Sequence, residues 1–102
     1  MREITMERVK ASEGVKFKVI GRITAVNEAY FDEMLTGALE EGFNSIVLNM
    51  QDVTLLTSLG IKIILKTFKS CLEADGRFRF EDPSEVVKSV MGLSALQQMM
   101  VD

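Results

Sequence analysis

Residues 45–61 form a strand-loop-helix pattern that limits the choice of fold more than any other part of the chain. An apolar run rich in β-branched side chains covers residues 45–50, and a turn with two hydroxyl side chains, Thr57 and Ser58, follows it. Such a run predicts a buried strand, and the apolar residues that recur after the turn predict an amphipathic helix. In an open α/β sheet, unpaired N–H groups at the start of such a helix favour an anion or a phosphorylated hydroxyl. We therefore expect any site of this protein at Thr57, Ser58 and Gly60.

The remaining elements follow from the spacing of apolar residues and from turn residues. Residues 11–14 supply turn residues between two alternating runs, as in an antiparallel hairpin, and residues 21–26 are expected to be a connection. Asn27 is the expected N-cap of the first helix, which Gly42 is placed to end. The expected strands span residues 4–10, 15–21, 45–50 and 77–80. The expected later helices span residues 61–74, 86–91 and 93–100.

A strand, a helix and a further strand in succession form a right-handed crossover unit, which sets the two strands parallel. The sequence therefore predicts an α/β fold with a four-stranded mixed, mostly parallel sheet, an N-terminal antiparallel strand and about four helices. The chain has 102 residues, the length of one ordinary domain, and one domain over residues 1–102 is expected.

The charge and hydropathy of the chain exclude several partners. There are 12 Lys and Arg residues against 15 Asp and Glu, a formal net charge of −3, and no long basic run follows one helix face. This pattern gives no footprint for nucleic acid. The longest apolar runs, such as residues 46–48 and 63–65, are far too short to cross a bilayer, and residues 1–4 open with charge rather than a signal peptide. A cytoplasmic protein without direct membrane insertion is expected.

Reactive side chains are scarce. The chain has no histidine, the commonest general base and the commonest ligand of zinc. Its single cysteine, Cys71, falls on the apolar side of a helical pattern, which predicts a buried, inert thiol. Asp52, Glu81 and Asp82 are candidates for a carboxylate site, but no metal-ligand spacing or glycine-rich phosphate loop accompanies them. The sequence therefore indicates a protein without catalytic activity, cofactor or metal ion.

The order of elements and the loop at residues 57–61 together resemble the STAS family, named for sulfate transporters and anti-sigma factor antagonists. In that family a valine-rich strand ends in a short loop, commonly Asp-Ser-Ser-Gly-Leu. The loop opens a helix, which is followed by a glycine-containing turn, a strand and a step such as Asn-Pro into the last helices. The resemblance covers nearly the whole chain. The corresponding segments here are Ile46-Val47-Leu48-Asn49-Met50, Thr57-Ser58-Leu59-Gly60-Ile61, Asp75-Gly76-Arg77-Phe78 and Asp82-Pro83-Ser84.

The resemblance implies a bacterial protein that binds an anti-sigma factor and thereby releases a sigma factor. It also implies that a loop serine is phosphorylated by the kinase activity of the anti-sigma factor, which switches binding off. Aligning Gly60 with the family glycine puts Ser58 on the first serine and Leu59 on the second, which is the usual phosphoacceptor. Leucine cannot accept phosphate, so the resemblance implies a switch that is altered or absent.

The acidic surroundings of a family phosphorylation site are also largely missing. Thr57 stands where aspartate is common, and Thr24 stands where family members often have another acidic residue. Asp52 is the acidic residue that remains nearby in the sequence.

Two interpretations of Ser58 stay open. As a helix cap it would accept a backbone N–H and contribute on the order of 1 kcal/mol, and as a switch it would carry phosphate at the same helix start. Thr57 has the same alternatives, while Gly60 is expected to relieve crowding against a partner or the sheet. The residues expected to contact a partner are Thr24, Thr57, Ser58, Leu59, Gly60 and Lys62.

The expected partner is an anti-sigma factor or a related serine kinase, bound by a monomer or weak dimer of this chain. An alternative of a different class is a STAS adaptor, without phosphorylation, in a signalling scaffold or a transporter-associated complex.

Overall fold

The computed structural model describes residues 3–11 and 14–92, which form four strands and three helices. The strands are β1 (Ile4–Lys10), β2 (Val15–Ile23), β3 (Ser45–Leu56) and β4 (Arg77–Glu81). The helices are α1 (Glu28–Glu40), α2 (Ser58–Glu73) and α3 (Glu85–Met91). The expected helix over residues 93–100 lies outside the described residues, which therefore hold three helices rather than about four.

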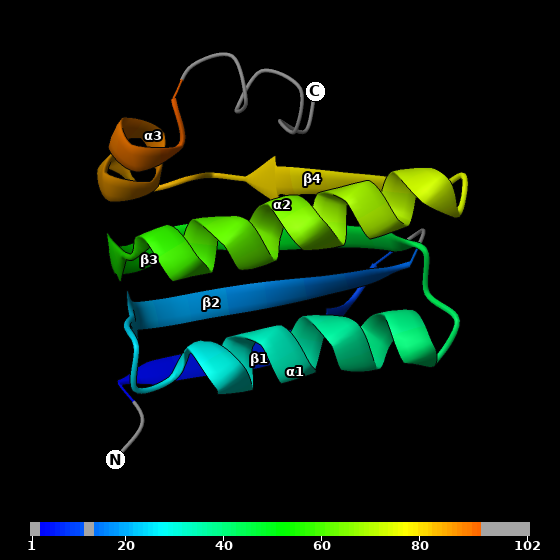
Figure 1. Cartoon of the computed structure of the whole chain (residues 1–102), viewed down its shortest axis with the longest axis horizontal. Coiled ribbons are helices and arrows are strands. Elements are labelled where there is room, and N and C mark those ends of the chain that lie inside the picture. The colour runs from blue at the N-terminus through cyan, green and yellow to red at the C-terminus, as the bar shows by residue number, and fades with distance from the viewer. Residues whose placement is uncertain (1–2, 12–13, 93–102) are drawn as a thin grey trace.

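The four strands form one sheet in the order β1-β2-β3-β4 (Figure 1). β1 and β2 pair antiparallel, whereas β2 with β3 and β3 with β4 pair parallel. The predicted mixed, mostly parallel sheet is thus confirmed. Because both parallel connections pass through a helix, α1 and α2 lie side by side on one face of the sheet and run in the same direction.

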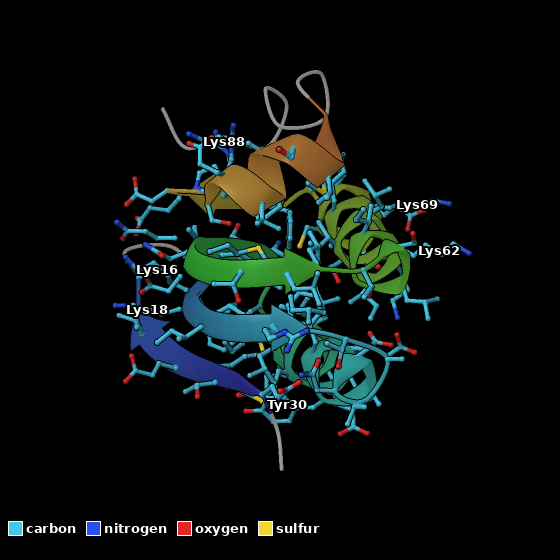
Figure 2. The ribbon with its side chains drawn as sticks, turned by 90° about the vertical axis from the view of Figure 1, so that its left-hand side faces the viewer. Lys16, Lys18, Tyr30, Lys62, Lys69 and Lys88 are labelled. Carbon is cyan, nitrogen blue, oxygen red and sulfur yellow. The ribbon has the colours of Figure 1, made fainter. Side chains whose placement is uncertain are left out.

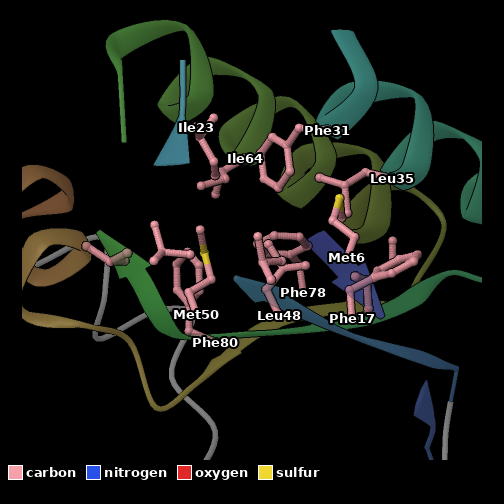
Figure 3. Close-up of a cluster of buried hydrophobic side chains, with 14 of the residues drawn as sticks. Met6, Phe17, Ile23, Phe31, Leu35, Leu48, Met50, Ile64, Phe78 and Phe80 are labelled. Carbon is pink, nitrogen blue, oxygen red and sulfur yellow. The ribbon is translucent and has the colours of Figure 1, made fainter. Parts of the chain in front are cut away.

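The core lies between this helical layer and the sheet (Figure 3). Alternate residues of each strand point into it, as the period of two requires, and α1 and α2 close it from above. Phe78 of β4 packs edge-to-face against Phe68 and Phe80, with ring centroids 6.2 and 5.9 Å apart. Burial of each large apolar side chain stabilises the fold by roughly 1.5–3 kcal/mol. The fully buried large side chains include Phe17, Ile23, Phe31, Leu35, Leu48, Met50, Ile64, Phe78 and Phe80.

The opposite face of the sheet is polar, and Lys16 and Lys18 point away from the helices there (Figure 2). The Lys16 ammonium and the Asn49 amide both donate to one oxygen of Glu81, at 2.9 and 3.0 Å. These hydrogen bonds, first from Asn49 and then from Lys16, hold the pKa of the Glu81 carboxyl below its ordinary value. The prediction of Lys16 and Lys18 as residues of the solvent-facing side is confirmed.

β3 is longer than the sequence predicts, because it continues past Met50 to Leu56. The register between β2 and β3 shifts after Asn49, where the backbone N–H of exposed Gln51 donates to the Asn49 side chain at 3.2 Å. Such a bulge interrupts the alternation of buried and exposed residues and makes a continuing strand look as if it ends. β2 likewise runs to Ile23 through residues that were expected to be a connection.

The hydrogen bonds to Glu81 predict a pH-dependent stability. Because the folded pKa is depressed, the stabilisation is fully present above the ordinary carboxyl pKa of about 4.3 and is lost as the pH falls through the folded pKa. We expect Glu81→Gln to lower the free energy of unfolding by about 0.5–1 kcal/mol near pH 7, with a loss that shrinks at low pH. Urea unfolding of both proteins across this pH range tests it, and a loss that is the same at every pH would contradict the assignment.

Candidate functional site

The candidate site lies where β2 and β3 end side by side. Ile23, the last residue of β2, is the register partner of Leu56, the last residue of β3. Thr24 and Thr57 follow these two residues directly, so the pairing of the strands brings their loops to the same edge of the sheet. Both threonines are half-buried. The structure therefore brings together two segments that are 33 residues apart in the chain.

Thr57, rather than Ser58, caps α2. Its backbone is extended, with φ −83° and ψ 168°, and its Oγ1 accepts the backbone N–H of Gly60 at 3.3 Å. Ser58 is already the first residue of the helix and is exposed, and none of residues 3–11 and 14–92 hydrogen-bonds its hydroxyl. The interpretation of Ser58 as the cap is thus wrong by one residue, because the extended backbone of β3 runs almost to the helix.

Gly60 is buried where α2 crosses the ends of the two strands. A Cβ atom at this position would lie 2.6 Å from Leu56 Cδ1 and 3.0 Å from Ile23 Cγ2, which is too close for both side chains to stay in place. Gly60 was expected to relieve crowding against a partner or against the sheet, and these contacts support the sheet. The glycine fixes the first turn of α2 against the strand ends.

Asn27 orders the loop before α1. It is 2% exposed, and its Oδ1 accepts the Thr24 N–H at 3.0 Å while its Nδ2 donates to the Arg22 carbonyl oxygen at 2.7 Å. Asn27 occupies the N-cap position as predicted, but its side chain makes no capping hydrogen bond to α1. The amide instead ties the end of β2 to the loop and so positions Thr24.

Two exposed apolar side chains mark this edge of the sheet. Leu59, on the first turn of α2, is 45% exposed, and Val26, in the loop before α1, is 84% exposed. The Val26 N–H donates to Thr24 Oγ1 at 3.2 Å, which fixes the turn that presents it. The sequence interpretation did not include Val26 among the residues expected to contact a partner. Its signal is an apolar side chain in a short connection, directly before the polar start of a helix.

A hollow of about 390 Å³ opens between the first turns of α1 and α2. Apolar side chains form part of its wall, and charged side chains from both helices surround them. The Lys66 ammonium and Asp32 carboxylate, 2.7 Å apart, join the two helices. The hollow is lined by Glu28, Ala29, Asp32, Leu59, Lys62, Ile63 and Lys66.

The acidic residues near Leu59 come from α1. Glu28 and Asp32 line the same hollow as Leu59, and one carboxylate oxygen of Glu28 is buried without a hydrogen-bond partner among the described residues. Asp52 does not contribute, since the five residues from Asp52 to Thr57 span about 16 Å of strand at roughly 3.3 Å per residue. Acidic residues near the site could therefore be found only once the helices had been placed.

The other reactive groups of the chain do not form a second site. Cys71 is buried, as predicted, and burial raises the pKa of its thiol to about 11. Glu81 is engaged by Lys16 and Asn49 on the opposite face of the sheet. Among residues 3–11 and 14–92, no cluster of three or more acidic or cysteine side chains is arranged to hold a metal ion.

Comparison with known proteins assigns the family. The model of the STAS domain matches residues 6–101. The chain belongs to the STAS domain family. A comparison with curated protein sequences finds no match. Within the described part of this STAS protein, no helix has both the length and the apolar character that crossing a membrane requires.

Solved structures show the same fold at low sequence identity. The anti-sigma factor antagonist SpoIIAA, unphosphorylated, matches with a TM-score of 0.80 and 19% identity over 96% of this chain and 87% of its own. The phosphorylated form of the Bacillus protein SpoIIAA gives 0.78 and 19% over 96% and 90%. A Thermotoga maritima protein, a candidate anti-sigma factor antagonist, gives 0.78 and 22% over 95% and 86%. The likeness shows a shared fold.

The two hydroxyl residues of the loop should differ in stability measurements. We expect Thr57→Ala to lower the free energy of unfolding by about 1 kcal/mol, because the Gly60 N–H loses its acceptor. The matched variant Ser58→Ala should change it by less than about 0.5 kcal/mol, because an exposed hydroxyl without such a bond is removed. Chemical denaturation measures both, and an equal loss in the two variants would contradict the assignment of Thr57 as the cap.

Proposed function

We propose that this STAS protein is a regulatory binding protein of the anti-sigma factor antagonist type, acting in the bacterial cytoplasm. It binds an anti-sigma factor or a related serine kinase through residues 57–61 and the neighbouring surface, and it has no catalytic activity of its own. The observation that carries this proposal is exposed Leu59 on the first turn of α2, beside the hollow between α1 and α2.

The arrangement of apolar and charged groups supports partner binding at this edge. Leu59 and Val26 offer apolar surface, and each Å² removed from water contributes about 25 cal/mol. Thr24, Thr57 and Ser58 place hydroxyl groups around these side chains, and Lys62 stands on the next turn of α2. A central apolar anchor with a polar rim is the usual arrangement of a protein interface. Gly60 contributes indirectly, because it sets the position of the first turn.

Leu59 also bears on the phosphorylation switch. In the family pattern this position usually holds the phosphoacceptor serine, and a leucine there keeps apolar surface where a phosphate would add charge. SpoIIAA, which has the same fold, has been solved in both a phosphorylated and an unphosphorylated form. We therefore propose that the partner complex of this protein is not broken by phosphorylation at residue 59, because leucine accepts no phosphate.

Ser58 is the better of the two remaining candidates for phosphorylation. Its hydroxyl is exposed at the positive end of the α2 dipole, which tolerates the added charge of about −1.5 to −2. Thr57 Oγ1 already accepts the Gly60 N–H, so a phosphate there would disturb the cap. Phosphate on Ser58 would place charge next to Leu59 and weaken an apolar contact.

A STAS adaptor without phosphorylation, in a signalling scaffold or a transporter-associated complex, is the second candidate function. The absence of a hydroxyl group at residue 59 favours it. Neighbouring genes distinguish the two candidates, because an adjacent anti-sigma factor kinase favours the antagonist and transporter subunits favour the adaptor.

Binding and phosphorylation can be tested in one experiment. The purified chain is mixed with the anti-sigma factor kinase of the same organism, with and without ATP, and the complex is followed by calorimetry and intact mass. We expect a complex that persists with ATP and a chain without phosphate. Phosphate on Ser58 or Thr57 with loss of the complex would instead show a switch whose acceptor has moved. Failure to bind any such kinase would favour the adaptor.

Substitution of Leu59 provides the sharper test of the surface. We expect Leu59→Glu to weaken kinase binding by at least about tenfold, because it places an unpaired charge in an apolar contact. Val9→Glu is the matched control, since Val9 is 38% exposed and pairs with Lys16 near the start of β2, at the other end of the sheet from Thr24 and Thr57. Equal affinity of the Leu59→Glu variant and the unsubstituted chain would refute the proposed contact.

A further inference from the structure

α1 and α2 lie side by side on one face of the molecule (Figure 1), and they carry opposite charge. All charged residues of α1 are acidic, and those of α2 are basic except for its last residue, Glu73. The acidic residues of α1 are Glu28, Asp32, Glu33 and Glu40. The basic residues of α2 are Lys62, Lys66 and Lys69. The helical face thus has an acidic half and a basic half.

Three acidic residues of α1 and two basic residues of α2 have no ion-pair partner within the described part of the chain, and Glu28 beside the hollow is one of the three. The single ion pair between the helices joins Asp32 and Lys66. Glu33 and Glu40 are exposed on α1, and Lys62 and Lys69 are exposed on α2, where they point away from the sheet (Figure 2). Each pair is separated by seven residues, so its members lie along one side of their helix.

Apolar surface accompanies the lysines. Leu65 and Leu72 are 43% and 51% exposed, also seven residues apart, and they alternate with Lys62 and Lys69 along α2. Exposed leucines at this spacing fit a helix that packs against another helix. The outer side of α1 matches this pattern. It carries two glutamates, which are opposite in charge to the lysines, and the small residues Ala29 and Gly37 beside them.

We propose that this helical face binds a second copy of the chain around a two-fold axis that runs between α1 and α2 and parallel to both. Rotation about that axis lays α1 of each copy over α2 of the other, so the acidic half meets the basic half twice in one dimer. A two-fold axis across the helices would instead lay α1 on α1 and α2 on α2, and like charges would repel. Charge complementarity therefore selects the first arrangement.

The size of the face indicates a weak, reversible dimer. α1 and α2 have 13 and 16 residues, so the two helices cover roughly 20 by 20 Å in each copy. Standard protein interfaces bury about 800 Å² per partner, and smaller ones belong to transient complexes. Because the hollow beside Leu59 lies in the same face, a second copy and the partner proposed above would exclude each other.

Charge reversal gives a test that needs no other protein. The double variant Glu33→Lys/Glu40→Lys places lysines along the outer sides of both helices, and Lys62→Glu/Lys69→Glu places glutamates along both. The substituted side chains are exposed, so the fold should tolerate them, and far-UV circular dichroism confirms this. Sedimentation equilibrium is then measured for the unsubstituted chain, each variant alone and the equimolar mixture. Ionic strengths of about 0.02 and 0.5 M change the screening length from above 20 Å to below 5 Å.

We expect the unsubstituted chain to dimerise at low ionic strength and to dissociate at least about tenfold more readily at high ionic strength. Each double variant should associate at least about tenfold more weakly, and the mixture should recover a one-to-one heterodimer. The control Glu7→Lys/Glu85→Lys changes the net charge by the same amount and in the same direction as Glu33→Lys/Glu40→Lys, away from the helical face, and should dimerise as before.

Three results would overturn the proposal. They are a monomeric unsubstituted chain at low ionic strength, double variants that dimerise as well as the control, and a mixture that stays monomeric. A monomeric unsubstituted chain would instead indicate that the helical face binds a different protein.

Discussion

The parallel pairing of β2 with β3, continued to the last residue of each strand, is the constraint on which the rest of this structure depends. Ile23 and Leu56 end as register partners, and both lie under Gly60. The loop before α1 and the cap of α2 therefore start from the same level of the sheet, and the two helices descend over the core side by side. The hollow and the exposed Leu59 between them follow from this arrangement, because each helix is held by its own strand.

Much of the fold could be predicted from the local pattern of the sequence. The alternation in residues 15–21 and the apolar run in residues 45–50 identified two strands whose pairing the crossover rule then determined. The ends of these strands could not be predicted in the same way. The bulge after Asn49 breaks the alternation of β3, and Gly21 interrupts the apolar pattern of β2, so pairing between strands rather than local preference carries both to their full length.

The candidate site was predictable in place but not in detail. A strand-to-helix junction at residues 57–61 was expected, since hydroxyl and glycine residues mark such a junction. The expected loop is wrong in extent, because residues 58–61 already belong to the first turn of α2. Which hydroxyl caps the helix depends on where the extended backbone stops, a difference of one residue that sequence patterns rarely resolve. Glu28 and Asp32 approach Leu59 only through the packing of α1 beside α2, so no property of the loop itself indicates them.

Asn27 has a consequence for the substitutions that this helix start can accept. Asparagine, aspartate and serine are close to interchangeable at helix N-caps, because each offers an oxygen to a free backbone N–H. Here the amide group also donates a hydrogen to the Arg22 carbonyl oxygen, in a position that is 2% exposed. A carboxylate would turn this contact into the repulsion of two acceptors, and a hydroxyl is too short to join both sides of the loop. Because the Asn27 side chain both accepts and donates a hydrogen bond, this N-cap position accepts asparagine but not aspartate or serine. Slow hydrolysis of the amide to a carboxylate would therefore detach the loop from the end of β2.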